Sequence, residues 1–358
     1  MNKFVSIVGA RPQFIKAAMI SNKIQNVDGI EEIMVHTGQH FDANMSDIFF
    51  NQLDISRPEI HHHIHGGNHG EMTGRMLVEI EKTLIEHKPD GVLVYGDTNS
   101  TLAGALASSK LHIPIAHVES GLRSFDIHMP EEVNRIVTDR LSDILLCPTD
   151  ISIHNLECEG FKNLSKRVVK VGDVMQDAAL FFASRAVAPA GFKLDPGFIL
   201  STVHRAENTD DPERLTSIIS ALNDIHQTVS PVVLPLHPRT HNAIKKLGLE
   251  LKVHLIEPVG YLEMIWLLNN CGLVLTDSGG VQKEAFFFGK ACVTLRDQTE
   301  WVELVNLGVN DIVGADCKKI IESVNHNFGR VVHDTNELYG GGRTSQNIVN
   351  ELMKWSYE

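Results

Sequence analysis

Short apolar runs alternate with helix-like stretches along the whole chain, and this alternation is the feature that most constrains the fold. Most of the runs are continuously apolar, which is typical of strands buried on both faces of a parallel sheet. They are FVSIVGA, EIMVHTG, GVLVYGD, PIAHVES, DILLCPT and RVVKVGD in the first half, and FILSTVH, PVVLPLH, VHLIEPV, LVLTDSGG and ACVTL in the second. Helix-like segments such as PQFIKAAMISNKI, with Pro12 at an expected N1 position, separate them. The pattern predicts an α/β protein with two Rossmann-like domains.

The length of the chain and a change in local composition predict where the domains divide. At 358 residues the chain exceeds the roughly 250–300 residues that one hydrophobic core usually supports. Ala, Pro and Gly replace the periodic pattern around residues 185–197, as in a linker. We expect an N-terminal Rossmann-like domain over residues 1–173, a helix and linker over 174–197, and a C-terminal Rossmann-like domain over 198–338. Residues 339–358 predict a glycine turn and an amphipathic helix that packs back on the first domain.

Charge and cysteine usage exclude several functional classes. The formal net charge is −13, and an acidic surface repels nucleic acid and anionic membranes, so neither is expected as a partner. No apolar run approaches the roughly 18 residues of a membrane span, and the first residues lack a signal-peptide pattern, so we expect a cytoplasmic protein. The five cysteines show no CxxC spacing, which indicates reduced thiols. Cys147 and Cys292 lie in strand-like runs and are expected in the core.

Polar side chains follow several predicted strands of the first half, at the edge where ligands bind in open α/β sheets. GARPQFIK opens a helix with Arg11 and Lys16 near its N-terminus, and it fits either an anion contact or an ordinary turn. YGDTNST places Asp97 directly after a strand, where an aspartate also serves as a helix cap. The segment HVESGLRSFDIHMPEEVNR carries Glu119, Glu131, Glu132, Arg123 and Arg135.

The second half holds a possible diphosphate site. In DSGGVQKEA, the backbone amides of Ser278, Gly279 and Gly280 open a helix, and Glu284 follows one turn later as a possible acceptor for ribose hydroxyls. The alternative is a capped loop. Arg296, after ACVTL, adds a positive charge to the same predicted site. In STVHRAEN, His204 ends a strand, where a histidine is either structural or functional.

The sequence lacks the motifs expected for a dinucleotide or a metal cofactor. No GxGxxG follows the first strand, so a dinucleotide site is not supported. The segment HHHIHGGNH suggests a metal site, because alternate histidines share one face of a strand. It lacks an HExxH or Cys/His spacing and a nearby acidic ligand, so we expect no metal there.

Taken together, these segments resemble one family, the non-hydrolysing UDP-N-acetylglucosamine 2-epimerases. The shared pattern covers nearly the whole chain and includes GARPQFIK, TGQH, YGDTNSTLAG, HVESGLRS, MPEEVNR, VGDVMQDA, VHRAEN, LTDSGGVQKEA, LRDQTEW and YGGG. The resemblance implies the GT-B glycosyltransferase fold, in which two Rossmann-like domains face a cleft and the second binds most of the UDP. It also implies a UDP-sugar substrate, no cofactor and a homodimer.

The resemblance assigns roles to matching positions. It implies acidic catalytic residues at Asp97, Glu119 and Glu131, and an active-site histidine at His204. The resemblance also implies that Arg11, Lys16 and Arg135 lie near the sugar and phosphates. The UDP-binding loop matches Ser278, Gly279, Gly280 and Glu284, with Arg296 nearby. In the implied reaction, loss of the C2 proton is coupled to loss of UDP at C1, so acids and bases are needed on both faces of the sugar.

Departures from the family pattern bear on the substrate. Many enzymes acting on UDP-N-acetylglucosamine (UDP-GlcNAc) read GTRPE where this chain has GARPQFIK, and QHFDANMSD replaces residues of the substrate-regulated bacterial enzymes. PQFIKAA, GQHFDANMS and HGEMTGRML resemble the subgroup acting on UDP-2,3-diacetamido-2,3-dideoxyglucuronate, which feeds mannuronate-containing O-antigens. We expect that substrate, with UDP-GlcNAc as the alternative. Its carboxylate would need a cationic or amide partner, for which Arg75, His69 and Arg123 are candidates.

Two other classes share parts of this pattern. A GT-B glycosyltransferase would have the same fold and UDP loop, but it would need an acceptor site and not so many acids in the first domain. A sugar-nucleotide binding protein would not need the acids at all. Only an epimerase makes a C2 epimer from the UDP-sugar alone.

Overall fold

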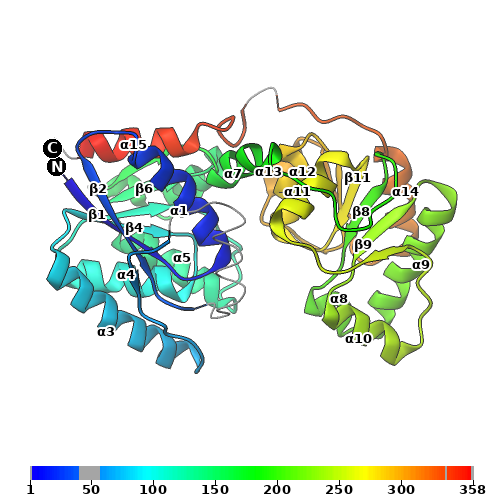
Figure 1. The fold of residues 1–358 in the computed structure, drawn as a ribbon, viewed down its shortest axis with the longest axis horizontal. Helices are drawn as coiled ribbons and strands as arrows, with labels where there is room; N and C mark the ends of the chain where they lie inside the picture. The colour runs from blue at the N-terminus through cyan, green and yellow to red at the C-terminus, as the bar shows by residue number, and fades with distance from the viewer. Residues whose placement is uncertain (1, 40–56, 335–336, 356–358) are drawn as a thin grey trace. The chain divides into compact units, whose positions relative to one another are not determined.

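The structure is a computed structural model that describes residues 2–39, 57–334 and 337–355 (Figure 1). Its contacts divide the chain into two compact units. Unit 1 comprises Met1–Ala178 and Glu337–Glu358, and unit 2 comprises Ala179–Asn336. The division falls inside helix α7 (Val174–Ala183), in the segment predicted to join the domains. The predicted domain limits at residues 173, 197 and 338 stay predictions. The cleft expected between the two domains also stays a prediction.

Unit 1 is built on a seven-stranded sheet whose described pairings are all parallel. The spatial order of the strands is β3-β2-β1-β4-β5-β6-β7. They are β1 (Asn2–Val8), β2 (Ile30–His36), β3 (Ile60–His61), β4 (Gly91–Tyr95), β5 (Ile115–Val118), β6 (Ile144–Cys147) and β7 (Arg167–Lys170). Because the strands run the same way, the segments that follow β1, β4 and β5 meet at one edge of the sheet.

Helices cover both faces of this sheet (Figure 1). α1 (Arg11–Ile24) and α15 (Thr344–Trp355) pack together on one face, while α3 (His69–His87), α4 (Asn99–Lys110) and α5 (Pro130–Leu141) lie on the other. α6 (Asp150–Cys158) and a 3-10 turn (Phe161–Asn163) connect β6 to β7. The core under α3 and α4 includes buried Val5, Val92 and Ile80.

Unit 2 is a second parallel α/β unit, with strand order β10-β9-β8-β11-β12-β13. Its strands are β8 (Ile199–Thr202), β9 (Val232–Pro235), β10 (His254–Ile256), β11 (Leu273–Thr276), β12 (Cys292–Thr294) and β13 (Asn310–Ile312). Its helices are α8 (Ala206–Thr209), α9 (Pro212–Thr228), α10 (Pro238–Leu247), α11 (Tyr261–Asn270), α12 (Gly279–Phe287), α13 (Val302–Asn306) and α14 (Cys317–Asn327). Separate apolar clusters form under α9 and α14 and under α11 and α12.

Local sequence signals explain where these elements begin. The Asp211 side chain accepts hydrogen bonds from two backbone N–H groups of α9 and caps that helix, with Pro212 in its first turn. The buried residues of α9 include Leu215, Ile218 and Leu222, at the three- and four-residue spacing of one helix face. Each such side chain contributes about 1.5–3 kcal/mol when fully buried.

The predicted strands are all present, and two short edge strands, β3 and β13, were not predicted. The first helix begins at Arg11, so Pro12 lies one position later than the expected N1. Cys147 and Cys292 are buried as expected, and burial raises the pKa of each thiol to about 12. Within the described residues, every helix is too short or too polar to cross a membrane.

Candidate active site

A cavity of about 230 Å³ lies at the carboxyl edge of the unit 1 sheet. Its walls come from the first turns of α1, α3, α4 and α5, whose N-termini favour negative charge. Three residues predicted to be catalytic or to lie near the sugar and phosphates line it, namely Lys16, Asp97 and Glu131, and so does His69, a candidate partner of the substrate carboxylate. The structure therefore brings together side chains that are more than a hundred residues apart in the sequence.

Asp97 follows β4 and is held by Arg135 of α5. The Arg135 Nη2 atom donates to Asp97 Oδ2 at 2.6 Å, and Nη1 donates to Glu132 Oε2 at 2.9 Å. Burial raises the pKa of Asp97, the charge of Arg135 opposes this, and the nearby Glu119 carboxylate adds to the rise. Arg135, predicted near the sugar and phosphates, is thus paired with two carboxylates in this structure.

Glu119 follows β5 in a left-handed backbone conformation, with φ of 72°. A left-handed glutamate is uncommon and costs free energy, so the surrounding contacts must hold it. Its backbone N–H and that of Ser120 both donate to Leu146 O, at 3.1 and 3.2 Å. The Glu119 side chain forms an ion pair with Lys16 of α1. Glu119 therefore points toward the Lys16 side of the cavity.

Glu131 and Glu132 are adjacent in α5 but have different surroundings. Glu131 is exposed and lines the cavity. Glu132 is buried and accepts hydrogen bonds from the backbone N–H groups of Ser124 and Phe125, both at 3.0 Å. Burial alone would raise the pKa of Glu132, but these hydrogen bonds and Arg135 hold it below the usual value. Glu132 is therefore an ionised structural residue beside the candidate catalytic glutamate.

Gln13 and Asn134 are buried residues of this cavity that were not predicted. Gln13 accepts from the backbone N–H groups of Gly9 and Ala10 and donates to Tyr95 O at 2.6 Å, so it joins the loops after β1 and β4. Asn134 donates to Asp97 O at 2.8 Å. Gln13 stands at the N3 position of α1, where a glutamine is a recognisable capping signal. The predicted Arg11 begins α1, but its side chain lies outside the described residues.

In unit 2, His204 follows β8 and is oriented by Asp277. The Nδ1 atom of His204 lies 3.1 Å from Asp277 Oδ1, and Asp277 also accepts from the backbone N–H groups of His204 and Arg205. Burial would raise the pKa of Asp277, but these hydrogen bonds hold it below the usual value. An ionised Asp277 keeps a proton on His204 Nδ1, so Nε2 is the atom available for exchange with a ligand. Asp277, quoted within a motif but given no role, is thus a further candidate.

The predicted UDP loop forms the N-terminus of α12. Ser278 is the N-cap residue without using its side chain to cap the helix, and Gly279 and Gly280 form the first turn. A Cβ atom at Gly279 would lie 2.4 Å from Glu300 Oε1, whereas one at Gly280 would meet open space. The indole of Trp301 donates to Gly279 O at 2.9 Å and braces the turn. Glu284 lies in the same helix.

Arg296 lies near this loop with its charge already paired. Its Nη1 atom donates to Glu300 Oε2 at 2.9 Å, and its Nε atom lies 3.7 Å from Glu207 Oε1. A phosphate contact with Arg296 would therefore compete with two carboxylates, and its role in anion binding stays a prediction.

The histidine-rich segment was considered above as a metal site. The ring of His61 stacks on that of His36 with centroids 4.1 Å apart, and it lies tilted against the ring of His63 at 3.8 Å. In the described part of the chain, no group of three or more His, Cys, Asp or Glu side chains could hold a metal ion.

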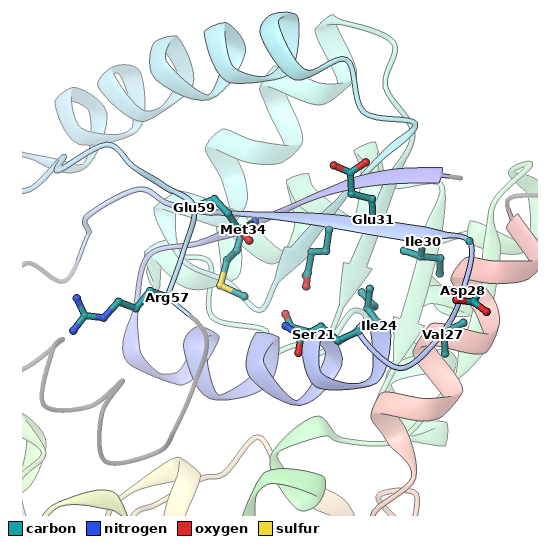
Figure 2. Close-up of a pocket in the computed structure, with 12 residues that line it drawn as sticks. Ser21, Ile24, Val27, Asp28, Ile30, Glu31, Met34, Arg57 and Glu59 are labelled. Carbon is teal, nitrogen blue, oxygen red and sulfur yellow. Dashed lines mark hydrogen bonds between the residues drawn. The ribbon is translucent and has the colours of Figure 1, made fainter.

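A larger cavity of about 430 Å³ lies between the C-terminal end of α1 and β2, and none of the predicted site residues lines it (Figure 2).

Comparisons with known proteins bear on the whole chain. The sequence model of a family described as UDP-N-acetylglucosamine 2-epimerase matches residues 22–353. A Pseudomonas aeruginosa protein named UDP-2,3-diacetamido-2,3-dideoxy-D-glucuronate 2-epimerase is 63% identical over 352 residues, which cover 98% of this chain and 99% of that protein.

Solved structures of UDP-GlcNAc 2-epimerases are also similar to this chain in sequence and fold. The UDP-GlcNAc 2-epimerase of Methanocaldococcus jannaschii, in complex with UDP-GlcNAc and UDP, is 40% identical with a TM-score of 0.85, over 98% of this chain and 99% of that one. The enzyme of Neisseria meningitidis bound to UDP-GlcNAc is 31% identical with a TM-score of 0.86, over 98% and 100% of the two chains. These similarities confirm the predicted GT-B class of α/β fold with two Rossmann-like units.

Proposed function

Because the chain belongs to the UDP-N-acetylglucosamine 2-epimerase family and is a UDP-sugar 2-epimerase, we propose that it inverts C2 of UDP-2,3-diacetamido-2,3-dideoxyglucuronate by eliminating UDP and adding it back. The observation that carries the mechanism is the gathering of Asp97 and Glu131 around one cavity, with Glu119 paired to Lys16 beside it. The mannuronate epimer formed would serve the synthesis of surface polysaccharides such as O-antigens.

The chemistry explains why several carboxylates are needed. The hydrogen on C2 is not α to a carbonyl, so its removal must be coupled to the departure of a leaving group. A carboxylate takes the C2 proton, the C–H electron pair forms a C1–C2 double bond, and the C1–O bond breaks with its electrons leaving on UDP. In the return step the UDP oxygen attacks C1, and an acid on the opposite face protonates C2. No atoms or electrons are gained or lost overall.

The surroundings of the carboxylates suit such proton exchange. Asp97 is half-buried and has a raised pKa, whereas Glu119 is ion-paired with Lys16. Carboxyl groups in different environments can divide the roles of acid and base at one pH. Lys16 and the N-termini of the surrounding helices would stabilise negative charge near the departing diphosphate. Arg135 supports this arrangement by holding Asp97.

Unit 2 supplies the proposed UDP site. The amides at the start of α12 favour a diphosphate, and Glu284 would accept hydrogen bonds from the ribose hydroxyls. His204, with its Nδ1 atom held by Asp277, would present Nε2 to the substrate. The match between this unit's loops and the family pattern supports these roles, and variants of each residue test them.

The identity of 63% to the Pseudomonas aeruginosa protein favours the uronate substrate over UDP-GlcNAc. Among the candidate partners for the uronate carboxylate, Arg123 is fully engaged by Asp139 and Glu159, which favours the other two. His69 lines the cavity next to Asn99, with 3.2 Å between Asn99 Nδ2 and His69 Nδ1. His69 is therefore the proposed contact.

Side-by-side assays with the two UDP-sugars test the substrate. Turnover of the uronate with little turnover of UDP-GlcNAc is expected. The reverse result would overturn the proposed substrate and leave the reaction class intact. A second candidate, a GT-B glycosyltransferase, would release UDP only with an acceptor, so formation of a C2 epimer from the UDP-sugar alone excludes it.

A further inference from the structure

A buried polar network lies directly beneath the proposed catalytic carboxylates. His117, in the middle of β5, is fully buried. Its Nδ1 atom lies 2.7 Å from Asp139 Oδ1, and its Nε2 atom lies 2.8 Å from Gly96 O. A backbone carbonyl only accepts hydrogen bonds, so the ring donates from Nε2 to Gly96 O, while Nδ1 lies against the Asp139 carboxylate.

The same network reaches the segment that bears Glu119. The second oxygen of Asp139 accepts from the Gly121 backbone N–H at 3.1 Å and from Arg123 Nη1 at 2.7 Å. Gly121 is two residues past Glu119 and has φ of 78°, with Ser152 O 2.4 Å from the position of a Cβ. Asp139 therefore fixes the turn that holds Glu119 in its left-handed conformation.

The network also fixes the other two acidic segments. Gly96, which accepts from His117, directly precedes Asp97 and has φ of 62°. Glu131, Arg135 and Asp139 follow one another on α5 at four-residue spacing, so these three side chains share one side of the helix. One buried histidine–aspartate pair thus contacts each of the three segments that carry Asp97, Glu119 and Glu131.

Arg123 links the network to a second carboxylate. Arg123 also donates to Glu159 through Nε and Nη2, at 2.6 and 2.8 Å. The Arg123 guanidinium therefore faces the two carboxylates of Asp139 and Glu159. A buried ion pair often adds little net stability compared with apolar packing, so stability alone does not explain this arrangement.

We infer that His117 and Asp139 are positioning residues for catalysis, which hold the three carboxylate-bearing segments in the geometry that the reaction needs. This inference rests on the proposed function, because it assumes that Asp97, Glu119 and Glu131 exchange protons with the substrate. His117 and Asp139 do not line the cavity and act through those residues. Misplacing a reacting group by about 1 Å can cost about 10²-fold in rate, so a lost contact here should reduce kcat.

Four variants of the full chain test the inference. His117→Asn keeps a donor near the Nδ1 position but loses the contact with Gly96 O, and His117→Gln keeps a donor near the Nε2 position. Asp139→Asn removes the charge of its partner. The matched control is Asp177→Asn, another buried aspartate of unit 1, which accepts from the Thr344 and Ser345 backbone N–H groups and does not line the cavity. For each, kcat, KM, UDP affinity and Tm are measured.

We expect His117→Asn and Asp139→Asn to lower kcat by about 10²-fold, with UDP affinity within about twofold of wild type. His117→Gln should recover part of the loss, and Asp177→Asn should lower Tm without a comparable loss of kcat. The inference is overturned if folded His117→Asn or folded Asp139→Asn keeps wild-type kcat. It is also overturned if Asp177→Asn loses as much kcat as those two variants. A wild-type protein that forms no C2 epimer would instead overturn the proposed function.

Discussion

The Asp97 carboxylate accepts a hydrogen bond from Arg135 at 2.6 Å, and yet the pKa of Asp97 is raised above its usual value. Burial is the largest cause of the shift, and it outweighs the opposing charge of the guanidinium. Asp97 is therefore an acid that keeps its proton to a higher pH than a solvated aspartate, as a proton-exchanging group of an epimerase should.

The pH dependence of catalysis tests this relationship. Arg135→Gln removes the main opposing cause, so the pKa of Asp97 should rise further and its ionised form should appear at a higher pH. If ionised Asp97 is the base, the acidic limb of the kcat/KM profile moves to higher pH. The control Arg140→Gln alters an exposed arginine of α5 and should leave that limb in place. An unmoved limb in Arg135→Gln would rule out Asp97 as the titrating group.

The three carboxylates should each be needed for turnover. Asp97→Asn, Glu119→Gln and Glu131→Gln keep side-chain size but remove the acid, and losing one general acid or base typically costs about 10²–10⁴ in rate. Asp150→Asn, which alters an exposed aspartate paired with Lys170, is the control and should keep full activity. Steady-state kinetics measure the effect, and near-normal rates in all three variants would refute the assignment.

The glycines that open α12 should differ in their effect on stability. Gly279→Ala places a Cβ atom 2.4 Å from Glu300 Oε1, so the Glu300 side chain must move and its pairing with Arg296 is disturbed, and Tm should fall slightly. Gly280→Ala meets open space and should leave Tm of the UDP-free protein unchanged. Thermal unfolding with and without UDP separates the two effects. If the loop holds the diphosphate, both variants should weaken binding, and unchanged UDP affinity in both would count against that role.

Glu284 should contribute to nucleotide affinity. Glu284→Ala is expected to weaken UDP binding by about 1–3 kcal/mol, because it leaves buried ribose hydroxyls without a partner. Calorimetry measures the dissociation constant, with Glu322→Ala, an exposed glutamate of α14, as the control. Equal affinity of wild type and Glu284→Ala would remove Glu284 from the proposed site.

The sequence predicted the strands because a strand buried on both faces needs a continuous apolar run. In β4, all five residues are buried. The same reasoning predicted where the polar motifs meet, since parallel strands end at one edge. β3 spans only two residues, and β13 reads Asn-Asp-Ile, so neither gives a continuous apolar run.

Side-chain pairing in the site could not be predicted because it depends on contacts between distant residues. Arg123 was a candidate partner for the substrate carboxylate, but it lies buried against Asp139 and Glu159, which are 16 and 36 residues away. Arg296 likewise pairs with Glu300 and lies near Glu207. Charge alone does not reveal which cations are already neutralised.

The fate of the hydrogen on C2 tests the central claim most directly. Wild-type enzyme is incubated with the UDP-sugar in D₂O, and the product is examined by NMR. If a carboxylate that exchanges with solvent takes the proton and an acid returns one to the opposite face, the epimer carries deuterium at C2, with traces of the glycal and free UDP. An epimer that retains its original hydrogen at C2 would contradict the elimination mechanism.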